Sequence, residues 1–173
     1  MTKRTGILIF PAVVAVSGIC AFAGQADATV AYPEGFRKWA LVKSTIMGPQ
    51  HGVFSEKPCE KPCTGGLFHF YANAKALEGY RTGKFPEGAV IADELLETKA
   101  SETAGVTLEG PRRGVGVMVK DSRRFGDTGG WGFETFDGGS RTEGRLSVEE
   151  KKACFTCHMA KKDRDFVFTQ YRE

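Results

Sequence analysis

The sequence predicts an α+β domain with a mainly antiparallel β-sheet and flanking helices. Five or so short apolar segments are separated by turns rich in Gly and Pro, which is typical of antiparallel strands. These expected strands are interleaved with helical patterns. Because strands are present, an all-helical arrangement is excluded. The expected strands come before the most distinctive motif of the chain, which lies close to the C-terminus. We therefore expect a curved sheet with helices at its ends.

The N-terminal part of this domain is expected to begin with a helix and a loop. Apolar residues recur at helical spacing between Pro33 and Thr45, namely at Phe36, Trp39, Ala40 and Val42. This spacing predicts a short amphipathic helix. The following residues 46–66 are rich in Gly, Pro and charged side chains and therefore predict a loop.

A strand and a second helix are expected next. Residues 67–72 are aromatic or apolar almost throughout, which is the composition of a strand. Asn73 is suited to cap a short helix over 74–81, and Gly83 is suited to end it.

Further strands are expected in three regions. The apolar run 89–96 predicts one strand. Residues 106–120 predict two strands that meet near Gly110 and Pro111, because the alternation of apolar residues changes side there. Residues 129–136 predict another strand, whose glycines let the backbone approach a flat and bulky group.

The last helix is expected to begin at a capping box. Ser147 is followed three positions later by Glu150, a pattern in which each side chain binds the other residue's backbone N–H. This helix carries Cys154, Cys157 and His158 on successive turns. The tail 166–171 alternates and predicts either a last strand or the end of a helix.

The motif Cys-x-x-Cys-His at residues 154–158 predicts the covalent attachment of one haem c. Thiols at Cys154 and Cys157 can each form a thioether with a haem vinyl group, and His158 is then delivered to the iron. A zinc site would need two further Cys or His ligands at suitable spacing. A thioredoxin-like redox pair would not need the adjacent histidine, so the motif favours haem.

The first 28 residues predict a cleaved signal peptide. Lys3 and Arg4 form a basic start, residues 7–23 are almost wholly apolar or small, and residues 26–28 form an Ala-x-Ala cleavage site. Cleavage after residue 23 or residue 31 is the alternative. The chain is therefore expected to be exported to the periplasm.

The mature chain, residues 29–173, is expected to be one haem-binding domain. Its Cys59 and Cys63 are expected to form a local disulfide in an oxidising compartment. Removal of the leader lowers the formal net charge from +3 to +2, which is too small and too evenly spread to indicate nucleic-acid binding. No later segment approaches the roughly 18 apolar residues of a membrane helix, so we expect no membrane partner.

Three segments before the haem motif add to its meaning by their order. They are 70–73 (Phe-Tyr-Ala-Asn), 83–91 (Gly-Lys-Phe-Pro-Glu-Gly-Ala-Val-Ile) and 130–133 (Gly-Trp-Gly-Phe). With the haem motif near the C-terminus, they make the chain resemble the cytochrome P-460 family, which includes cytochrome c′-beta. The likeness runs through nearly the whole mature chain.

The resemblance implies a homodimer and a five-coordinate haem whose proximal ligand is the motif histidine, here His158. Relatives either oxidise hydroxylamine, when the haem carries an extra cross-link to a lysine, or bind nitric oxide or carbon monoxide in a pocket capped by phenylalanine. Lys84 is the candidate for the cross-link, and a solvated turn lysine is the alternative. A redox partner protein is expected in addition.

Aromatic and acidic residues supply candidates for the rest of the pocket. Phe133 is assigned to the cofactor, and its neighbour Glu134 is the candidate proton relay, because oxidation of hydroxylamine releases protons. A strand-edge glutamate facing water is the alternative for Glu134. The phenylalanines that either cap the iron or pack in the core are Phe54, Phe68, Phe70, Phe85, Phe133 and Phe136.

The sixth position of the iron separates a gas-binding or catalytic protein from an electron carrier. A carrier usually has a second strong axial ligand, commonly Met or His. The candidates lie in segments that do not indicate ligation: Met47, Met118, Met159, His51 and His69. We therefore expect an open iron that binds small nitrogen species or a diatomic gas. A six-coordinate electron-transfer cytochrome is the alternative.

Overall fold

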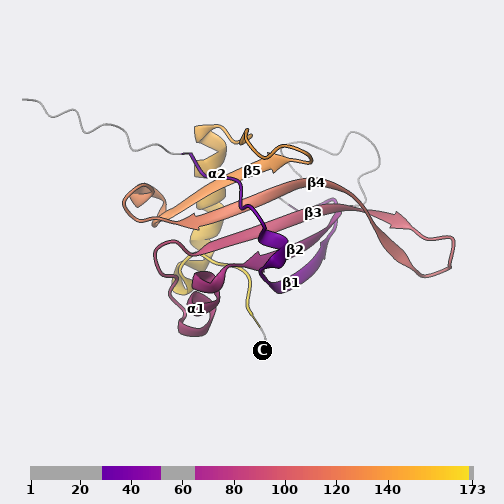
Figure 1. Cartoon of the computed structure of the whole chain (residues 1–173), viewed down its shortest axis with the longest axis horizontal. Coiled ribbons are helices and arrows are strands. Elements are labelled where there is room, and N and C mark those ends of the chain that lie inside the picture. The colour runs from indigo at the N-terminus through magenta and orange to yellow at the C-terminus, as the bar shows by residue number, and fades with distance from the viewer. Residues whose placement is uncertain (1–28, 52–64, 172–173) are drawn as a thin grey trace, which may run out of the picture.

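The computed structural model describes residues 29–51 and 65–171. These residues form one antiparallel sheet with helices around it (Figure 1). The strands are β1 (Ala40–Met47), β2 (Gly66–Ala72), β3 (Val90–Ala100), β4 (Thr107–Lys120) and β5 (Trp131–Asp137). The helices are η1 (Phe36–Lys38), α1 (Ala74–Thr82), η3 (Gly126–Thr128), α2 (Val148–His158) and η4 (Met159–Arg164).

The strand order in the sheet follows the order in the chain, β1-β2-β3-β4-β5, and every neighbouring pair is antiparallel. The long strands β3 and β4 continue past the other strands as a projecting hairpin (Figure 1). The predicted α+β class, with an antiparallel sheet and flanking helices, is thereby confirmed.

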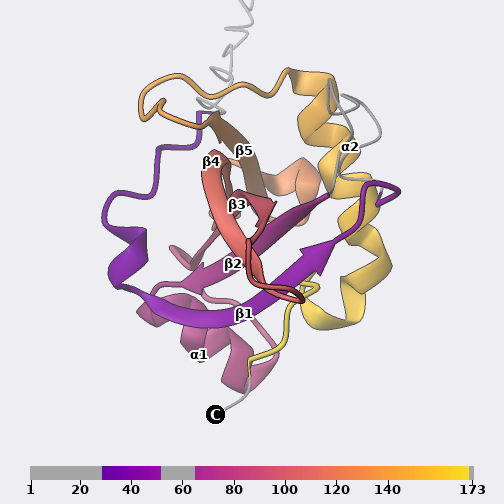
Figure 2. The ribbon, with the colours of Figure 1, turned by 90° about the vertical axis from the view of Figure 1, so that its right-hand side faces the viewer.

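The two faces of the sheet are covered by different parts of the chain (Figures 1 and 2). Helices α1 and α2 and the C-terminal segment pack on one face, which we call the helix face. Its buried residues are Val42, Ala72, Ala76, Phe85, Ala89, Ile91, Trp131, Phe133 and Val167. The segment 29–38 crosses the other face, which we call the N-terminal face. Its buried residues are Val30, Phe36, Ala92, Val115, Val117, Phe125 and Phe136.

The helix predicted over residues 33–45 is wrong for most of its length. Only Phe36–Lys38 form a single 3-10 turn, and residues 40–47 form strand β1 at the edge of the sheet. Three of its residues are β-branched, Val42, Thr45 and Ile46, and they fit a pleated surface better than a helix. Pairing with β2 therefore decides the structure, against a helical spacing of apolar residues.

The two strands predicted over residues 106–120 are one continuous strand, β4. The expected break falls within an irregular part of its pairing with β3, where the register shifts between Leu95 and Leu96 and again before Thr98. Pro111 lies in this stretch, where its missing N–H is not needed by the ladder. The tail 166–171 is neither a strand nor a helix, but an irregular segment that follows η4.

The caps predicted for both α-helices are confirmed. The Asn73 side chain accepts a hydrogen bond from Ala76 N–H, and Gly83 ends α1 in the left-handed conformation at φ 79°. At the start of α2 the capping box is complete, because Ser147 accepts from the Glu150 N–H while the Glu150 carboxylate accepts from the Ser147 N–H.

Several predictions concern residues outside the described parts of the chain. These are the signal peptide over residues 1–28, the disulfide between Cys59 and Cys63, and the assignment of Phe54. Across residues 29–51 and 65–171, no helix has the length and the apolar character needed to cross a membrane.

Candidate functional site

Helix α2 brings the two thiols and the imidazole of the motif to one end. Its capping box fixes the start at Ser147, and its last turns carry Cys154, Cys157 and His158. Cys154 is half-buried and packs against the core of the helix face, whereas Cys157 is exposed. The two sulfurs and the imidazole therefore lie along the border between the core and solvent, on a helix whose start is fixed.

His158 lies among aromatic rings, and one of its ring nitrogens is already bound. Its ring centre is 5.1 Å from that of Phe133 and 5.0 Å from that of Phe168. Its Nδ1 is 2.6 Å from the carbonyl oxygen of Phe166, and because a carbonyl only accepts, Nδ1 carries the proton. The Nε2 lone pair is then available to a metal. Burial lowers the pKa of His158, although the Phe166 carbonyl opposes this.

An unusual turn presents that carbonyl to His158. Asp165 and Phe166 both adopt left-handed conformations, with φ of 50° and 66°. Asp165 is held from three sides: its carboxylate accepts from Lys120 Nζ at 2.7 Å and from Phe85 N–H at 2.9 Å, and its carbonyl accepts from Trp131 Nε1 at 2.8 Å. These contacts offset the strain of the turn. They make the orientation of His158 a property of the folded sheet.

A carboxyl group lies at the centre of the helix face. Asp93 of β3 is flanked in register by Phe70 of β2 and Gly116 of β4. Its carboxylate covers Gly116 so closely that a Cβ there would come within 2.2 Å of Oδ2. Burial raises the pKa of Asp93 from 3.8 to about 6, against hydrogen bonds from the backbone of Gly116 and of Asp93 itself. The helix face therefore holds a carboxyl that titrates near neutral pH.

The residues of the helix face fit a c-type haem. A c-type haem needs two thiols, a neutral imidazole with a fixed tautomer, and an apolar surface for the porphyrin. Cys154, Cys157 and His158 provide the first two, and the third is provided by partly buried aromatic side chains that pack with Phe133, including Phe70 and Phe155.

The sequence-predicted site residues lie in three separate surroundings. Phe133 lies beside His158, together with the motif residues. Lys84 lies in the exposed turn after α1, where its backbone meets the Thr82 hydroxyl. The role of Lys84 in a cross-link stays a prediction.

The buried Glu134 has a set of contacts of its own. Its carboxylate accepts from the Leu146 N–H at 2.9 Å and from Thr135 N–H at 3.0 Å, and it pairs with Lys151 Nζ at 2.8 Å. These contacts tie the segment before α2, and α2 itself, to β5. The alternative of a strand-edge side chain facing water is wrong, because Glu134 is buried, and its role as a proton relay stays a prediction.

Two functional candidates were missed by the sequence analysis. Asp93 and Glu94 interrupt the apolar run 89–96, and this pair of carboxylates is the signal that would have found Asp93. The Asp165–Phe166 turn leaves a weaker signal, because aspartate is enriched in left-handed conformations but phenylalanine is not.

The alternative axial ligands lie in different surroundings. His69 binds Ser44 Oγ through Nδ1 at 2.8 Å and contacts Tyr71, and alternation along β2 places it on the N-terminal face. Met159 is 48% exposed. Met118 is partly buried on the helix face, next to Phe133 in the register of β4 and β5. Of the two strand residues, Met118 shares a face with His158 and His69 does not.

The antiparallel sheet, with two thiols and a tautomer-fixed imidazole on its helix face, defines a haem-binding α+β domain. A family model described as Cytochrome P460 matches residues 33–169, which is most of the chain. The chain therefore belongs to the cytochrome P460 family, and membership implies a haem cofactor. No curated protein matches the chain significantly.

Proposed function

We propose that the chain is an exported c-type haem protein that binds or oxidises small nitrogen species such as nitric oxide and hydroxylamine. Cys154 and Cys157 attach one haem covalently, and His158 ligates the iron from one side. The other axial position is open. Once bound, the haem supplies an iron that accepts such ligands and exchanges electrons.

The observation that carries this proposal is the hydrogen bond from His158 Nδ1–H to the Phe166 carbonyl. It fixes the tautomer that presents Nε2, on the same helix as the two thiols of the motif. Phe133 and Phe168 flank the ring and limit the access of water to it. The lowered pKa of His158 keeps the imidazole neutral, which is the state that binds a metal.

Asp93 supports a reaction in which protons are released. Its pKa of about 6 lies near neutral pH, where a carboxyl group is best able both to take up and to return a proton. It shares the helix face with Phe70, Ile91 and Phe133. Oxidation of hydroxylamine gives off protons and electrons together, and we propose that a redox partner protein receives the electrons.

The absorption spectrum of the purified ferrous protein, recorded before and after the addition of carbon monoxide, tests the proposal. An open iron gives a spectrum that changes with carbon monoxide. A low-spin, six-coordinate spectrum in both oxidation states, unchanged by the gas, would contradict the open site and support the electron-carrier alternative. Met118→Leu is the matched variant, because it removes the candidate sixth ligand that lies on the helix face next to Phe133.

Mass spectrometry of the haem peptide distinguishes the two activities. An enzyme that oxidises hydroxylamine is expected to carry a lysine adduct and to turn over with an electron acceptor. A gas-binding protein is expected to bind nitric oxide without the adduct. Lys84→Arg retains the charge and removes the adduct only if Lys84 is the cross-linked residue.

Export and assembly form part of the same proposal. The leader over residues 1–28 is cleaved and the mature domain acts in the periplasm as a homodimer. The projecting end of the β3–β4 hairpin supports an assembled state, because the apolar residues Val106 and Leu108 there are 42% and 52% exposed. Light scattering of the mature protein, compared with a Val106→Ser and Leu108→Ser variant, tests the dimer.

A further inference from the structure

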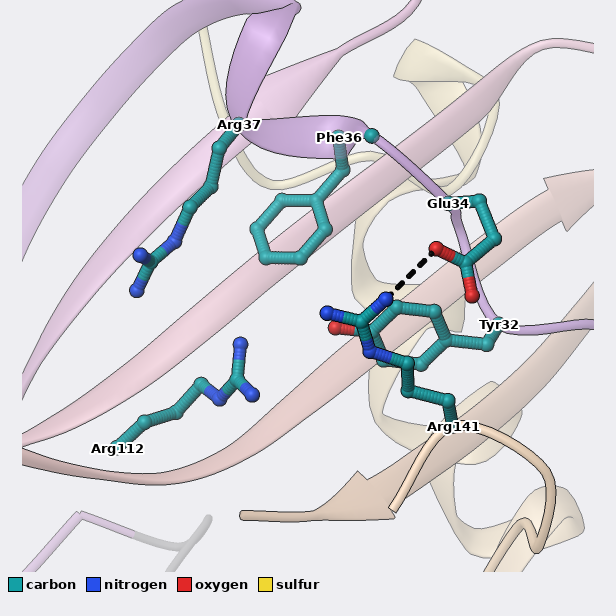
Figure 3. Close-up of a pocket in the computed structure, with 7 residues that line it drawn as sticks. Tyr32, Glu34, Phe36, Arg37, Arg112 and Arg141 are labelled. Carbon is teal, nitrogen blue, oxygen red and sulfur yellow. Dashed lines mark hydrogen bonds and ion pairs between the residues drawn. The ribbon is translucent and has the colours of Figure 1, made fainter. Parts of the chain in front are cut away.

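A pocket lies on the N-terminal face of the sheet, on the side opposite to α2 (Figure 3). Its volume is about 300 Å³ and it is open on one side. Segments distant in the chain contribute to it: the 32–37 segment, β4 and the loop after β5. The lining residues are Tyr32, Glu34, Gly35, Phe36, Arg37, Arg112 and Arg141.

A buried carboxylate holds two of these arginines side by side. Glu94 of β3 is 2% exposed, and Arg37 donates to it through Nη2 and through Nε at 3.1 and 3.2 Å. Arg112 Nη1 is 3.5 Å from the same carboxylate, while its Nε donates to the Gly138 carbonyl at 2.8 Å. One carboxylate thus faces two guanidinium groups. The Nη1 of Arg37 and the Nη2 of Arg112 are available to a ligand.

The third arginine, Arg141, forms an exposed ion pair whose carboxylate a ligand can replace. Arg141 Nη1 lies 3.2 Å from Glu34 Oε2, and both side chains are more than 60% exposed. Exposed ion pairs of this kind contribute little, so the guanidinium can turn to another anion at small cost. The Arg141 guanidinium also lies 5.7 Å from the centre of the Tyr32 ring. In Figure 3, Arg37, Arg112 and Arg141 approach the same space from different sides.

We propose that this pocket binds a small organic carboxylate between Arg37 and Arg112, with its apolar part against Tyr32 and Phe36. Three guanidinium groups face two carboxylates, Glu94 and Glu34, and the excess charge of +1 matches a monoanion. Arg37 Nη1 and Arg112 Nη2 can each donate a hydrogen bond to one oxygen of a planar carboxylate, and such charge-assisted bonds are stronger than neutral ones. The aromatic wall favours an organic anion over an inorganic one, because it offers apolar contact that phosphate cannot use.

This site is separate from the proposed haem function. Glu94 follows Asp93 directly, and alternation along β3 sends the two side chains to opposite faces. A carboxylate in the pocket therefore lies across the sheet from His158 and leaves the helix face open.

Titration calorimetry of the haem-loaded mature protein with benzoate tests the proposal. Benzamide, which has the same shape without the charge, and inorganic phosphate are the comparison ligands. We expect saturable binding of benzoate and at least about tenfold weaker binding of both comparison ligands. Binding of phosphate as tight as that of benzoate, or equal binding of benzamide, overturns the proposal.

Two variants locate the site, and a third is the control. Arg37→Lys keeps the charge beside Glu94 but removes the planar fork, and Arg141→Gln changes a residue that does not contact Glu94. Each is expected to weaken benzoate binding several-fold, with an unchanged haem spectrum and circular dichroism as the check on folding. Arg81→Gln, on the exposed end of α1, is expected to leave the affinity unchanged. If Arg37→Lys and Arg141→Gln bind benzoate as tightly as the parent protein does, the carboxylate lies elsewhere and the proposal is overturned. The proposal is also overturned if Arg81→Gln loses as much affinity as these two variants.

Discussion

Asp93 and Glu94 are neighbours on one strand, yet the two faces of the sheet treat their carboxyl groups in opposite ways. On the N-terminal face, Glu94 is buried with two arginines beside it. On the helix face, Asp93 lies among apolar and aromatic residues, and burial raises its pKa to about 6. The comparison shows that Glu94 is paired with cations on its face, whereas burial on the other face disfavours the charged form of Asp93.

This difference matches what each face is built to hold. A neutral imidazole, two thiols and a porphyrin need an apolar surface with few fixed charges. The arginines of the opposite face need a carboxylate to keep them in place. One strand therefore separates an apolar cofactor surface from a cationic pocket, and substitutions on the two faces are expected to have different consequences.

The largest expected effect is on the helix face. Replacement of both Cys154 and Cys157 by serine should abolish thioether attachment of the haem, because the motif then has no thiol. A haem stain of the denatured protein on a gel, together with extraction by acid acetone, measures this. The single variants keep one thiol of the motif and are the controls. Haem that survives denaturation in the double variant without a lysine adduct would contradict the thioether attachment.

The next effect is on the N-terminal face. Glu94→Gln removes the buried charge between Arg37 and Arg112 and should lower the free energy of unfolding by about 2 kcal/mol, less than for a fully buried pair because Arg37 is 60% exposed. Urea denaturation of the haem-loaded protein measures it. Glu34→Gln breaks the exposed pair with Arg141 and should cost less than about 0.5 kcal/mol. Equal costs for the two variants would remove the distinction between buried and exposed pairs.

Asp93→Asn should raise the free energy of unfolding at neutral and alkaline pH, whereas Glu94→Gln should lower it. The pKa of Asp93 is about 6 in the folded protein and 3.8 ordinarily, so its contribution to stability is fully present below pH 4 and is lost as the pH rises through 6. The variant should therefore be more stable than the parent at pH 8 by about 2 kcal/mol, after allowance for the partial solvent contact of the side chain. Urea denaturation from pH 4 to pH 8 measures the change.

The control for this experiment is Asp127→Asn in the exposed turn η3. It should leave the pH dependence of unfolding as it is in the parent. A parent protein whose stability does not fall between pH 4 and pH 8, or an Asp93→Asn variant that keeps the fall, would show that Asp93 does not titrate as described.

The smallest expected effect concerns the start of α2. Ser147→Ala removes the N-cap and should lower the free energy of unfolding by about 1 kcal/mol, with haem attachment preserved. Thermal unfolding followed by circular dichroism is the measurement. Thr156→Ala, an exposed site within the same helix, is the control and should change stability by less than about 0.5 kcal/mol.

Local signals were the parts of the fold that the sequence could predict. The Asn73 cap, the Gly83 end of α1 and the capping box of α2 depend on residues three to four positions apart, and all were predicted from such short windows. The local spacing of β1 predicts a helix, whereas its actual structure depends on pairing with β2, some twenty residues away. The continuity of β4 across Pro111 likewise depends on its partner strand.

The candidate site divides in the same way. The haem motif and Phe133 could be found from the sequence, because the motif is contiguous and Phe133 lies in a distinctive glycine-rich segment. The Phe166 carbonyl could not be found, because its position results from contacts that Lys120, Phe85 and Trp131 make with Asp165. The arginine pocket also escaped detection, since Arg37, Arg112 and Arg141 are far apart in the chain.

The identity of the acceptor beside His158 has a consequence for the electronic character of the ring. A carboxylate in that position would draw the Nδ1 proton toward itself and give the ligand imidazolate character. The Phe166 peptide carbonyl is uncharged and does not take up the proton, so the ring stays a neutral and moderate donor. A moderate donor stabilises an oxidised metal less strongly than an imidazolate does, so the peptide carbonyl of the Asp165–Phe166 turn sets the donor strength of the ring.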